Sequence, residues 1–164
     1  MSKAKNIKYL VILSAAVLIV VAAIYVTSHR ISPLSWGWFG PINVSDGIAL
    51  AGYDSVAYHT EKNSLEGKQE HRTTWKEVEW RFASEYNREL FIADPERYAP
   101  QYGGNCANAV SRGLTKKADP QVWFVKDDKL YVFAFEESKT KFINKIPNGV
   151  LEKNHESWAR RTIQ

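Results

Sequence analysis

The fold is decided by the stretch Trp80–Ala109, which reads WRFASEYNRELFIADPERYAPQYGGNCANA. At its start, Val78, Trp80 and Phe82 alternate with polar residues, and this period of two predicts a half-buried strand. The preceding residues Thr73–Trp75 suit a strand that pairs with it in a hairpin. We therefore expect a small antiparallel sheet at this point of the chain.

A helix is predicted directly after the strand. Ser84 is well placed as its N-cap, with Glu85 in the first turn, which satisfies free backbone N–H groups and complements the helix dipole. The predicted apolar stripe of this helix consists of Tyr86, Leu90 and Phe91.

Proline and glycine then divide the chain into short elements. Proline disrupts a helix interior, so Asp94-Pro95 predicts the end of the helix. After Gly103-Gly104, the segment Cys106–Arg112 is predicted to form a second short helix, with Gly113 at its C-cap.

The remaining chain completes the predicted fold class, which is α+β. Val122–Val125 and Leu130–Phe135 are β-prone runs that predict a hairpin buried on both faces. Residues Glu136–Ile146 and Val150–Arg161 are predicted to be helical. We expect a small antiparallel sheet covered by helices, within a globular domain of residues 44–164.

A transmembrane anchor is predicted within residues 1–30. Tyr9–Val26 contains no charged side chain, and at about 1.5 Å per residue its helix nearly crosses a hydrocarbon core about 30 Å thick. Lys3, Lys5 and Lys8 precede it, so the positive-inside bias places the N-terminus in the cytoplasm and the domain outside.

A cleaved signal peptide is the alternative interpretation, with Val21-Ala22-Ala23 as its cleavage site. The apolar run is longer than the usual apolar region of such peptides, about 7 to 15 residues, which favours an uncleaved anchor. After it, residues 31–43 form an aromatic juxtamembrane linker with Trp36, Trp38 and Phe39. These rings suit either the membrane interface or the surface of the domain.

The charge distribution excludes one class of partner. The chain has 22 Lys and Arg and 18 Asp and Glu, and four of the basic residues lie at or before Arg30. The outer domain therefore carries 18 positive and 18 negative side chains, a formal charge of zero. Nucleic-acid binding needs a positive excess, so we expect no nucleic-acid partner.

Several motifs in order resemble the YHS-domain family. The segment Ala51–Tyr58, AGYDSVAY, is similar to the family's GYDPVAY opening, with serine in place of proline. Ala118-Asp119-Pro120 with Trp123 is similar to its ADP-x-x-W element, and Asp128–Tyr131 to its DGKLY element. The resemblance extends over about residues 46–160. It implies a domain of the bacterial inner membrane, on the periplasmic side, but no particular activity.

Two departures from the family pattern matter. Relatives tend to have a glycine in the hairpin turn, where Lys76-Glu77 stands here, so this turn is of another type or is strained. Metal-binding relatives carry two cysteines in a Phe-Cys-Ser-x-x-x-Cys pattern, and Ala83 and Asn87 occupy those positions. Neither residue is a good soft-metal ligand, so that metal site cannot assemble here.

A different metal site would have to use Cys106 with His59 and His71, and copper or zinc would be its ion. Neither histidine has the short spacing to Cys106 that indicates a preformed cluster. The start of a helix favours a thiolate, so Cys106 could be a metal ligand, a redox-sensitive thiol or a nucleophile. Free cysteine is also among the most buried residue types, which favours a structural role.

A ligand site is predicted beside the Gly-Gly turn, where polar, aromatic and glycine residues gather. Its candidate residues are Tyr53, Asp54, Tyr98, Gln101, Tyr102, Gly103, Gly104 and Cys106. The two glycines could form a small anion-binding nest, or serve only positive φ and close packing. The polar side chains could instead tie loops to the sheet by hydrogen bonds.

The sequence contains no recognised catalytic pattern. We therefore predict a membrane-anchored, extracytoplasmic, YHS-like binding module, non-catalytic, that engages a small ligand, a metal ion or a protein partner. The first alternative is a soft-metal (copper) handling or thiol-redox protein that acts through Cys106. The second is an assembly role, in which Trp36–Phe39 docks the domain on a protein of a membrane complex.

Overall fold

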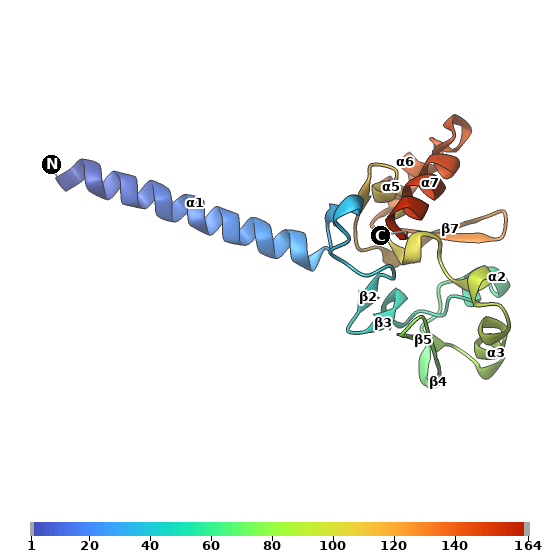
Figure 1. Cartoon of the computed structure of the whole chain (residues 1–164). Helices are drawn as coiled ribbons and strands as arrows, with labels where there is room; N and C mark the ends of the chain where they lie inside the picture. Colours follow the sequence, from blue (N-terminus) through green and yellow to red (C-terminus); the bar gives the residue numbers. More distant parts are fainter. Residues whose placement is uncertain (1, 163–164) are drawn as a thin grey trace.

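A long N-terminal helix projects from a globular unit (Figure 1). The computed structural model of the chain describes residues 2–162. The helix α1 (Ser2–Ser28) contains a segment of 22 residues, Ile7–Ser28, that is long and apolar enough to cross a membrane and is not covered by the rest of the chain. The predicted apolar helix is confirmed, while the choice between anchor and signal sequence stays a prediction.

The largest sheet has four strands in the order β2-β3-β5-β4. Its strands are β2 (Val44–Ser45), β3 (Ile48–Ala49), β4 (Lys68–Trp75) and β5 (Val78–Phe82). The hairpin of β4 and β5 is antiparallel, as predicted, with Thr73 opposite Trp80. However, β3 runs parallel to β5, so the sheet is mixed, which corrects the expectation of a purely antiparallel one.

The hairpin turn has the conformation that glycine would favour. Lys76 and Glu77 have φ angles of 50° and 63°, which fits a type I′ turn. An L-residue in this left-handed region costs roughly 1–2 kcal/mol. The turn is thus of the usual hairpin type and strained, and Asp127 and Asp128 repeat the pattern in the second hairpin with φ of 51° and 56°.

The second predicted hairpin consists of β7 (Asp119–Lys126) and β8 (Lys129–Phe133). Residues 130–133 of β8 are all buried, whereas β7 alternates between exposed and buried residues at its start. The expected burial on both faces therefore holds for β8 and not for β7.

The segment expected to be a linker belongs to the globular unit. A third small sheet pairs β1 (Ser32–Pro33) with β6 (Leu114–Thr115). The side chains of Leu34 and Ile42 are also buried in the core. Residues 31–43 thus join α1 to the domain through a strand pair rather than through a free connection.

Helices and turns surround the sheets, so the α+β class is confirmed. The helices are α2 (Ala57–Thr60), α3 (Glu85–Ala93), α4 (Pro95–Tyr98), α5 (Ala107–Val110), α6 (Glu136–Ile143) and α7 (Val150–Thr162). The 3-10 turns are η1 (Leu34–Trp36), η2 (Leu50–Gly52), η3 (Gln101–Gly104) and η4 (Ile146–Asn148). In Figure 1 the four-stranded sheet lies with α2 and α3, and β7 lies with α5, α6 and α7.

The inner face of α3 differs from the predicted stripe. Ser84 is its N-cap, as expected, and accepts the N–H of Asn87. Phe91 is fully buried, but Tyr86 is 65% exposed and Asn87 is buried in its place. Asn87 and Phe91 are four residues apart and share one helix face, so this face carries an amide into the core.

Candidate functional site

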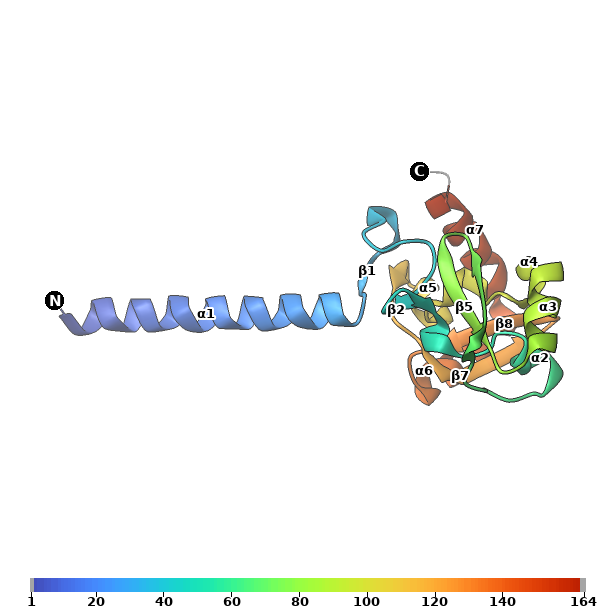
Figure 2. The same ribbon diagram turned by 90° about the horizontal axis from the view of Figure 1, so that it is seen from below.

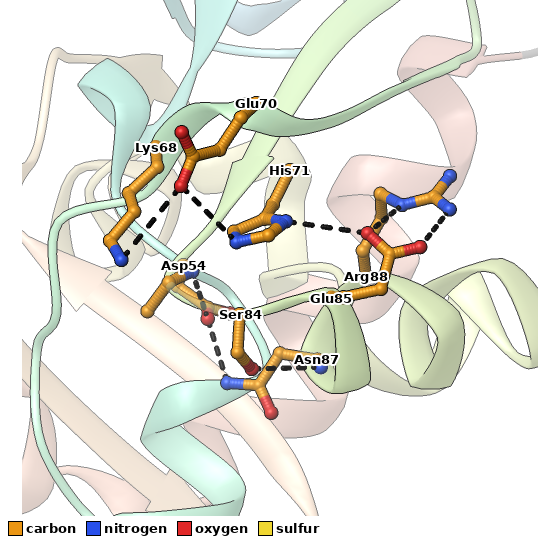
Figure 3. A network of polar contacts seen from close by, with 9 residues as sticks. Asp54, Lys68, Glu70, His71, Ser84, Glu85, Asn87 and Arg88 are labelled. Carbon is orange, nitrogen blue, oxygen red and sulfur yellow. Dashed lines mark hydrogen bonds and ion pairs between the residues drawn. The ribbon is translucent and has the colours of Figure 1, made fainter.

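Asp54 is fully buried and lies at the centre of a hydrogen-bond hub. Its Oδ1 accepts the backbone N–H groups of Val56 at 2.8 Å and Ala57 at 3.2 Å. Its Oδ2 accepts the N–H of Ala83 at 2.8 Å and the Asn87 amide at 2.7 Å, the last drawn in Figure 3. These four bonds occupy the carboxylate. The Asp54 hub therefore ties the start of α2 to the junction of β5 and α3, which is a structural role.

Cys106 is buried and has local partners. Its side chain is 1% exposed, and its Sγ lies 3.2 Å from the Ser138 hydroxyl of α6. Its N–H donates to the carbonyl of Lys116 at 2.9 Å. Cys106 is the N-cap of α5, which is shorter than the predicted helix Cys106–Arg112, and its thiol faces the interior.

The two histidines suggested as partners of Cys106 each have other contacts. His59 Nδ1 lies 3.3 Å from the Asp128 carboxylate, and its ring packs edge-on against Tyr98. Burial lowers the pKa of His59. His71 lies between Glu70 and Glu85, as Figure 3 shows. Among residues 2–162, no group of three His, Cys, Asp or Glu is placed to hold a metal ion.

The predicted Gly-Gly turn is left-handed over three residues, because Tyr102, Gly103 and Gly104 have φ of 56°, 59° and 75°. A Cβ at Gly103 would lie 1.8 Å from the Pro41 carbonyl oxygen. Asn43 donates its N–H to the Gly103 carbonyl at 2.7 Å and its amide to Gly104 at 3.0 Å. Glycine is therefore required here for close approach of the segment that follows α1.

A cavity of about 250 Å³ opens beside this turn, and we call it the aromatic pocket. Its lining includes three tryptophans from different elements, namely Trp75 of β4, Trp80 of β5 and Trp158 of α7. Trp80 donates its indole N–H to the Trp75 carbonyl at 3.2 Å, which fixes two of these rings relative to each other. Tyr102 contacts the third ring, with centroids 6.0 Å apart.

The aromatic pocket also has polar and charged residues in its lining. Lys76 forms an ion pair with Glu96 at 2.8 Å and lies over the Trp75 ring. The Tyr102 hydroxyl is buried near the Asn154 side chain, and no hydrogen bond of full geometry joins it to another described residue. Burial raises the pKa of Tyr102, with the neighbouring Asn154 acting in the opposite direction. His155 completes the polar lining next to Tyr102.

The structure divides the predicted ligand residues. Gln101, Tyr102 and Gly103 line the aromatic pocket. The other five, Tyr53, Asp54, Tyr98, Gly104 and Cys106, lie outside its lining. The Tyr53 hydroxyl instead accepts a hydrogen bond from Gln121 at 2.8 Å, which is the loop-tying role weighed for these residues.

Sequence reasoning missed the tryptophans and His155. They come from two strands of a hairpin and from the last helix, and no local spacing connects these elements. The one signal in the sequence was Trp158, which stands among polar residues of the last predicted helix. A large aromatic side chain usually packs against another part of the protein.

The fold and the pocket define a class of protein, an α+β domain with one apolar N-terminal helix and a small aromatic cavity. Comparison of the chain with protein-family models, with curated proteins and with solved structures found no match. The resemblance to YHS domains therefore depends on the motifs of the sequence alone.

Proposed function

We propose that this protein is a membrane-anchored, non-catalytic binding module that takes a small, flat, uncharged organic molecule into the aromatic pocket. The observation that carries this proposal is the cavity of about 250 Å³ lined by Trp75, Trp80 and Trp158 beside the buried Tyr102 hydroxyl. Ligand sites are typically concave and apolar, with a few polar groups that orient the ligand.

The lining indicates the chemistry of the ligand. Indole faces favour flat rings, which they contact by offset or edge-on stacking. The Tyr102 hydroxyl lies near Asn154 without a well-formed hydrogen bond, and it would gain one with a polar atom on such a ring. The charge of Lys76 is already matched by Glu96, so the pocket favours a neutral ligand over an anion.

The absence of catalysis is part of the proposal and follows from how the reactive groups are occupied. The Asp54 carboxylate has four hydrogen-bond donors, and the Cys106 thiol is buried against Ser138. Neither group lines the aromatic pocket. A bound molecule would thus meet hydrogen-bonding and stacking groups without an activated nucleophile.

The proposed setting is the inner membrane of a bacterium, with α1 as a single uncleaved span. The lysines before the apolar run support a cytoplasmic N-terminus. The globular domain, and the aromatic pocket with it, would then lie on the periplasmic side. This location agrees with the one that the resemblance to the YHS-domain family implies.

The experiment uses tryptophan fluorescence of the full chain in a mild detergent, with naphthol as a neutral flat probe and naphthoate as its charged match. We expect naphthol to quench the fluorescence saturably and naphthoate to bind at least about tenfold more weakly, since a buried, unpaired charge costs more than 1.4 kcal/mol. Trp158→Ala should abolish binding, and Tyr102→Phe should weaken it.

Trp38→Ala is the matched control, because Trp38 is exposed and lies outside the pocket. It should bind naphthol as the unchanged protein does. Equal binding by Trp158→Ala, or stronger binding of naphthoate, would contradict the proposed site.

A further inference from the structure

Three arginines gather on the side of the domain that faces α1. Arg30 follows α1 directly, and Arg160 and Arg161 lie near the end of α7. The turn η1 contacts α7, and both lie at the α1 side of the domain in Figures 1 and 2. The start and the end of the globular unit therefore bring positive charges together, although the outer domain as a whole is neutral.

Arg30 and Arg161 share the segment after η1. The guanidinium of Arg30 lies 4.7 Å from the ring centroid of Phe39. Arg161 donates from Nη2 to the carbonyls of Phe39 and Gly40, the second at 3.1 Å. These contacts hold both guanidinium groups at one place in the fold.

The positive charge at this place is not neutralised. Arg30 Nε and Arg161 Nη1 are buried without a hydrogen-bond partner among the described residues. No ion pair found in residues 2–162 joins Arg30, Arg160 or Arg161 to a carboxylate. Burial lowers the pKa of both Arg30 and Arg161, and the charge of Arg30 further lowers that of Arg161. An anion at this place would relieve both effects.

A cavity of about 390 Å³ adjoins these side chains, and we call it the arginine cavity. It is lined by Leu34, Ser35, Gly113, Ser157, Arg160 and Arg161. The lining thus contains two guanidinium groups and two hydroxyls and no carboxylate among its described residues. Guanidinium groups bind phosphate oxygens through short, charge-assisted hydrogen bonds. The Ser35 hydroxyl can donate to the same oxygens, whereas the Ser157 hydroxyl donates to the Lys153 carbonyl at 2.8 Å.

The position of the arginine cavity indicates the source of the phosphate. Leu34 and Ser35 of its lining belong to η1, which also carries Trp36. Trp36 and Trp38 are 56% and 64% exposed, and their rings are 4.5 Å apart. Exposed tryptophans beside the end of an apolar helix are typical of the membrane interface, where lipid phosphates lie.

Hydrogen bonds also hold the domain against the end of α1, so the arginine cavity stays near the membrane interface. The N–H of Lys117 donates to the carbonyl of His29 at 2.9 Å. The Thr115 hydroxyl donates to the carbonyl of Arg30 at 2.9 Å. Together with the pairing of β1 and β6, these bonds restrict movement of the arginine cavity away from the bilayer surface.

We propose that the arginine cavity binds the phosphate of an anionic phospholipid headgroup in the bilayer that α1 crosses. Arg160 and Arg161 contact the phosphate oxygens, Ser35 donates to them, and Trp36 and Trp38 enter the interface beside the headgroup. This inference rests on the proposed membrane anchoring and does not depend on the aromatic pocket.

The experiment compares lipid retention in the full chain, purified in a mild detergent with phosphatidylglycerol or phosphatidylcholine added, by native mass spectrometry. We expect phosphatidylglycerol to be retained preferentially. Arg160→Gln should reduce this retention about tenfold, because a hydrogen bond to a charged group is worth about 1.4 kcal/mol or more. Arg160→Lys should restore part of it.

Lys129→Gln is the matched control, since Lys129 is an exposed cation in the hairpin turn at the start of β8. It removes the same charge and should leave retention unchanged. Arg161→Gln should also lose the lipid, but Arg161 holds Phe39 and Gly40, so its melting temperature is measured alongside. If Arg161→Gln does not fold, the lipid retention of Arg160→Gln tests the proposal by itself.

Three results would overturn the proposal. They are full retention by Arg160→Gln, equal retention of both lipids, and displacement of phosphatidylglycerol by inorganic phosphate at the same concentration, which would assign the cavity to a soluble anion. The intact mass of the chain in membranes reports anchoring separately. Loss of residues 1–30 in that measurement would contradict the anchor, whereas lipid loss with an intact chain would contradict the arginine cavity alone.

Discussion

The Asp54 hub and the arginine cavity both contain charged side chains, but they differ in how the buried polar atoms of these side chains are satisfied. In the hub, both oxygens of Asp54 accept two hydrogen bonds each. At the arginine cavity, Nη1 of the lining residue Arg161 and Nε of its neighbour Arg30 have no partner within the described chain. Because a buried, unpaired polar group is costly, a satisfied charge indicates a structural element and an unsatisfied one indicates a place for a ligand.

The largest expected effect comes from removing the satisfied charge. Asp54→Ala leaves the N–H groups of Val56, Ala57 and Ala83 buried without an acceptor. We expect a loss of about 4 kcal/mol in the free energy of unfolding, measured by denaturant titration of the full chain in micelles. Glu89→Ala removes an exposed carboxylate from α3 and serves as the control. A loss below about 1 kcal/mol for Asp54→Ala would contradict the structural role of the Asp54 hub, and with it the contrast with the arginine cavity.

The next effect tests the Gly-Gly turn, against which residues 41–43 pack beside the aromatic pocket. Gly103→Ala combines positive φ with a Cβ placed 1.8 Å from the Pro41 oxygen, and we expect a loss of about 3 kcal/mol. Gly113→Ala has positive φ but no atom within 4 Å of the new Cβ. It should therefore cost only about 1 kcal/mol, and the difference in melting temperature between the two variants measures the steric clash.

Cys106 offers a smaller and chemically distinct test. Its thiol should react with a maleimide only after unfolding, because the side chain is 1% exposed. Cys106→Ala should lower the free energy of unfolding by about 1 kcal/mol through lost packing. Rapid labelling of the native protein, or Cu(I) binding that Cys106→Ser abolishes, would instead support the soft-metal or thiol-redox alternative.

Removing an unsatisfied charge should have little effect on stability. In lipid-free micelles, we expect Arg30→Gln to change the free energy of unfolding by less than about 1 kcal/mol. The lost contact with Phe39 and the relieved desolvation act in opposite directions. A loss as large as that of Asp54→Ala would show that Arg30 is a structural residue like Asp54.

The smallest effect concerns the pH dependence of stability. Burial lowers the pKa of His59 in the folded state, while Asp128 acts to raise it and Lys62 and Arg97 act to lower it. The unfolded state then binds more protons below the ordinary value of about 6.5, so stability is complete above that pH and falls as the pH decreases below it. His59→Gln should flatten this fall in thermal melts between neutral and acidic pH, and an unchanged profile would contradict the assignment.

The sequence predicted those parts of the fold that depend on neighbouring residues. The alternation at Val78, Trp80 and Phe82 gave the strand β5, and Ser84 gave the start of α3. Asp94-Pro95 gave the boundary between α3 and α4. Periodicity, capping and proline geometry act within a few residues, so a single segment contains the whole signal.

The candidate sites were predicted less well, because a motif does not reveal which way a side chain faces. Asp54 and Cys106 stand in the motifs that suggested a ligand site, yet both face the interior. Asn87 looked like a lost metal ligand, but it is the amide that completes the Asp54 hub. Gln101, Tyr102 and Gly103 line the aromatic pocket, and their role in ligand binding stays a prediction.

By itself, the sequence determined the apolar helix, the hairpins, the N-cap of α3 and the glycine turn, since these depend on local sterics and on the pattern of apolar residues. The C-cap predicted at Gly113 is instead Ser111, because α5 ends at Val110. Only the tertiary structure decided that Trp158 meets Trp75 and Trp80 in one pocket, and that Arg161 lies with Arg30 at the end of α1. Such meetings of distant residues arise from the packing of whole elements around a shared core. The Asp54 hub and the arginine cavity were therefore visible only once the chain was folded.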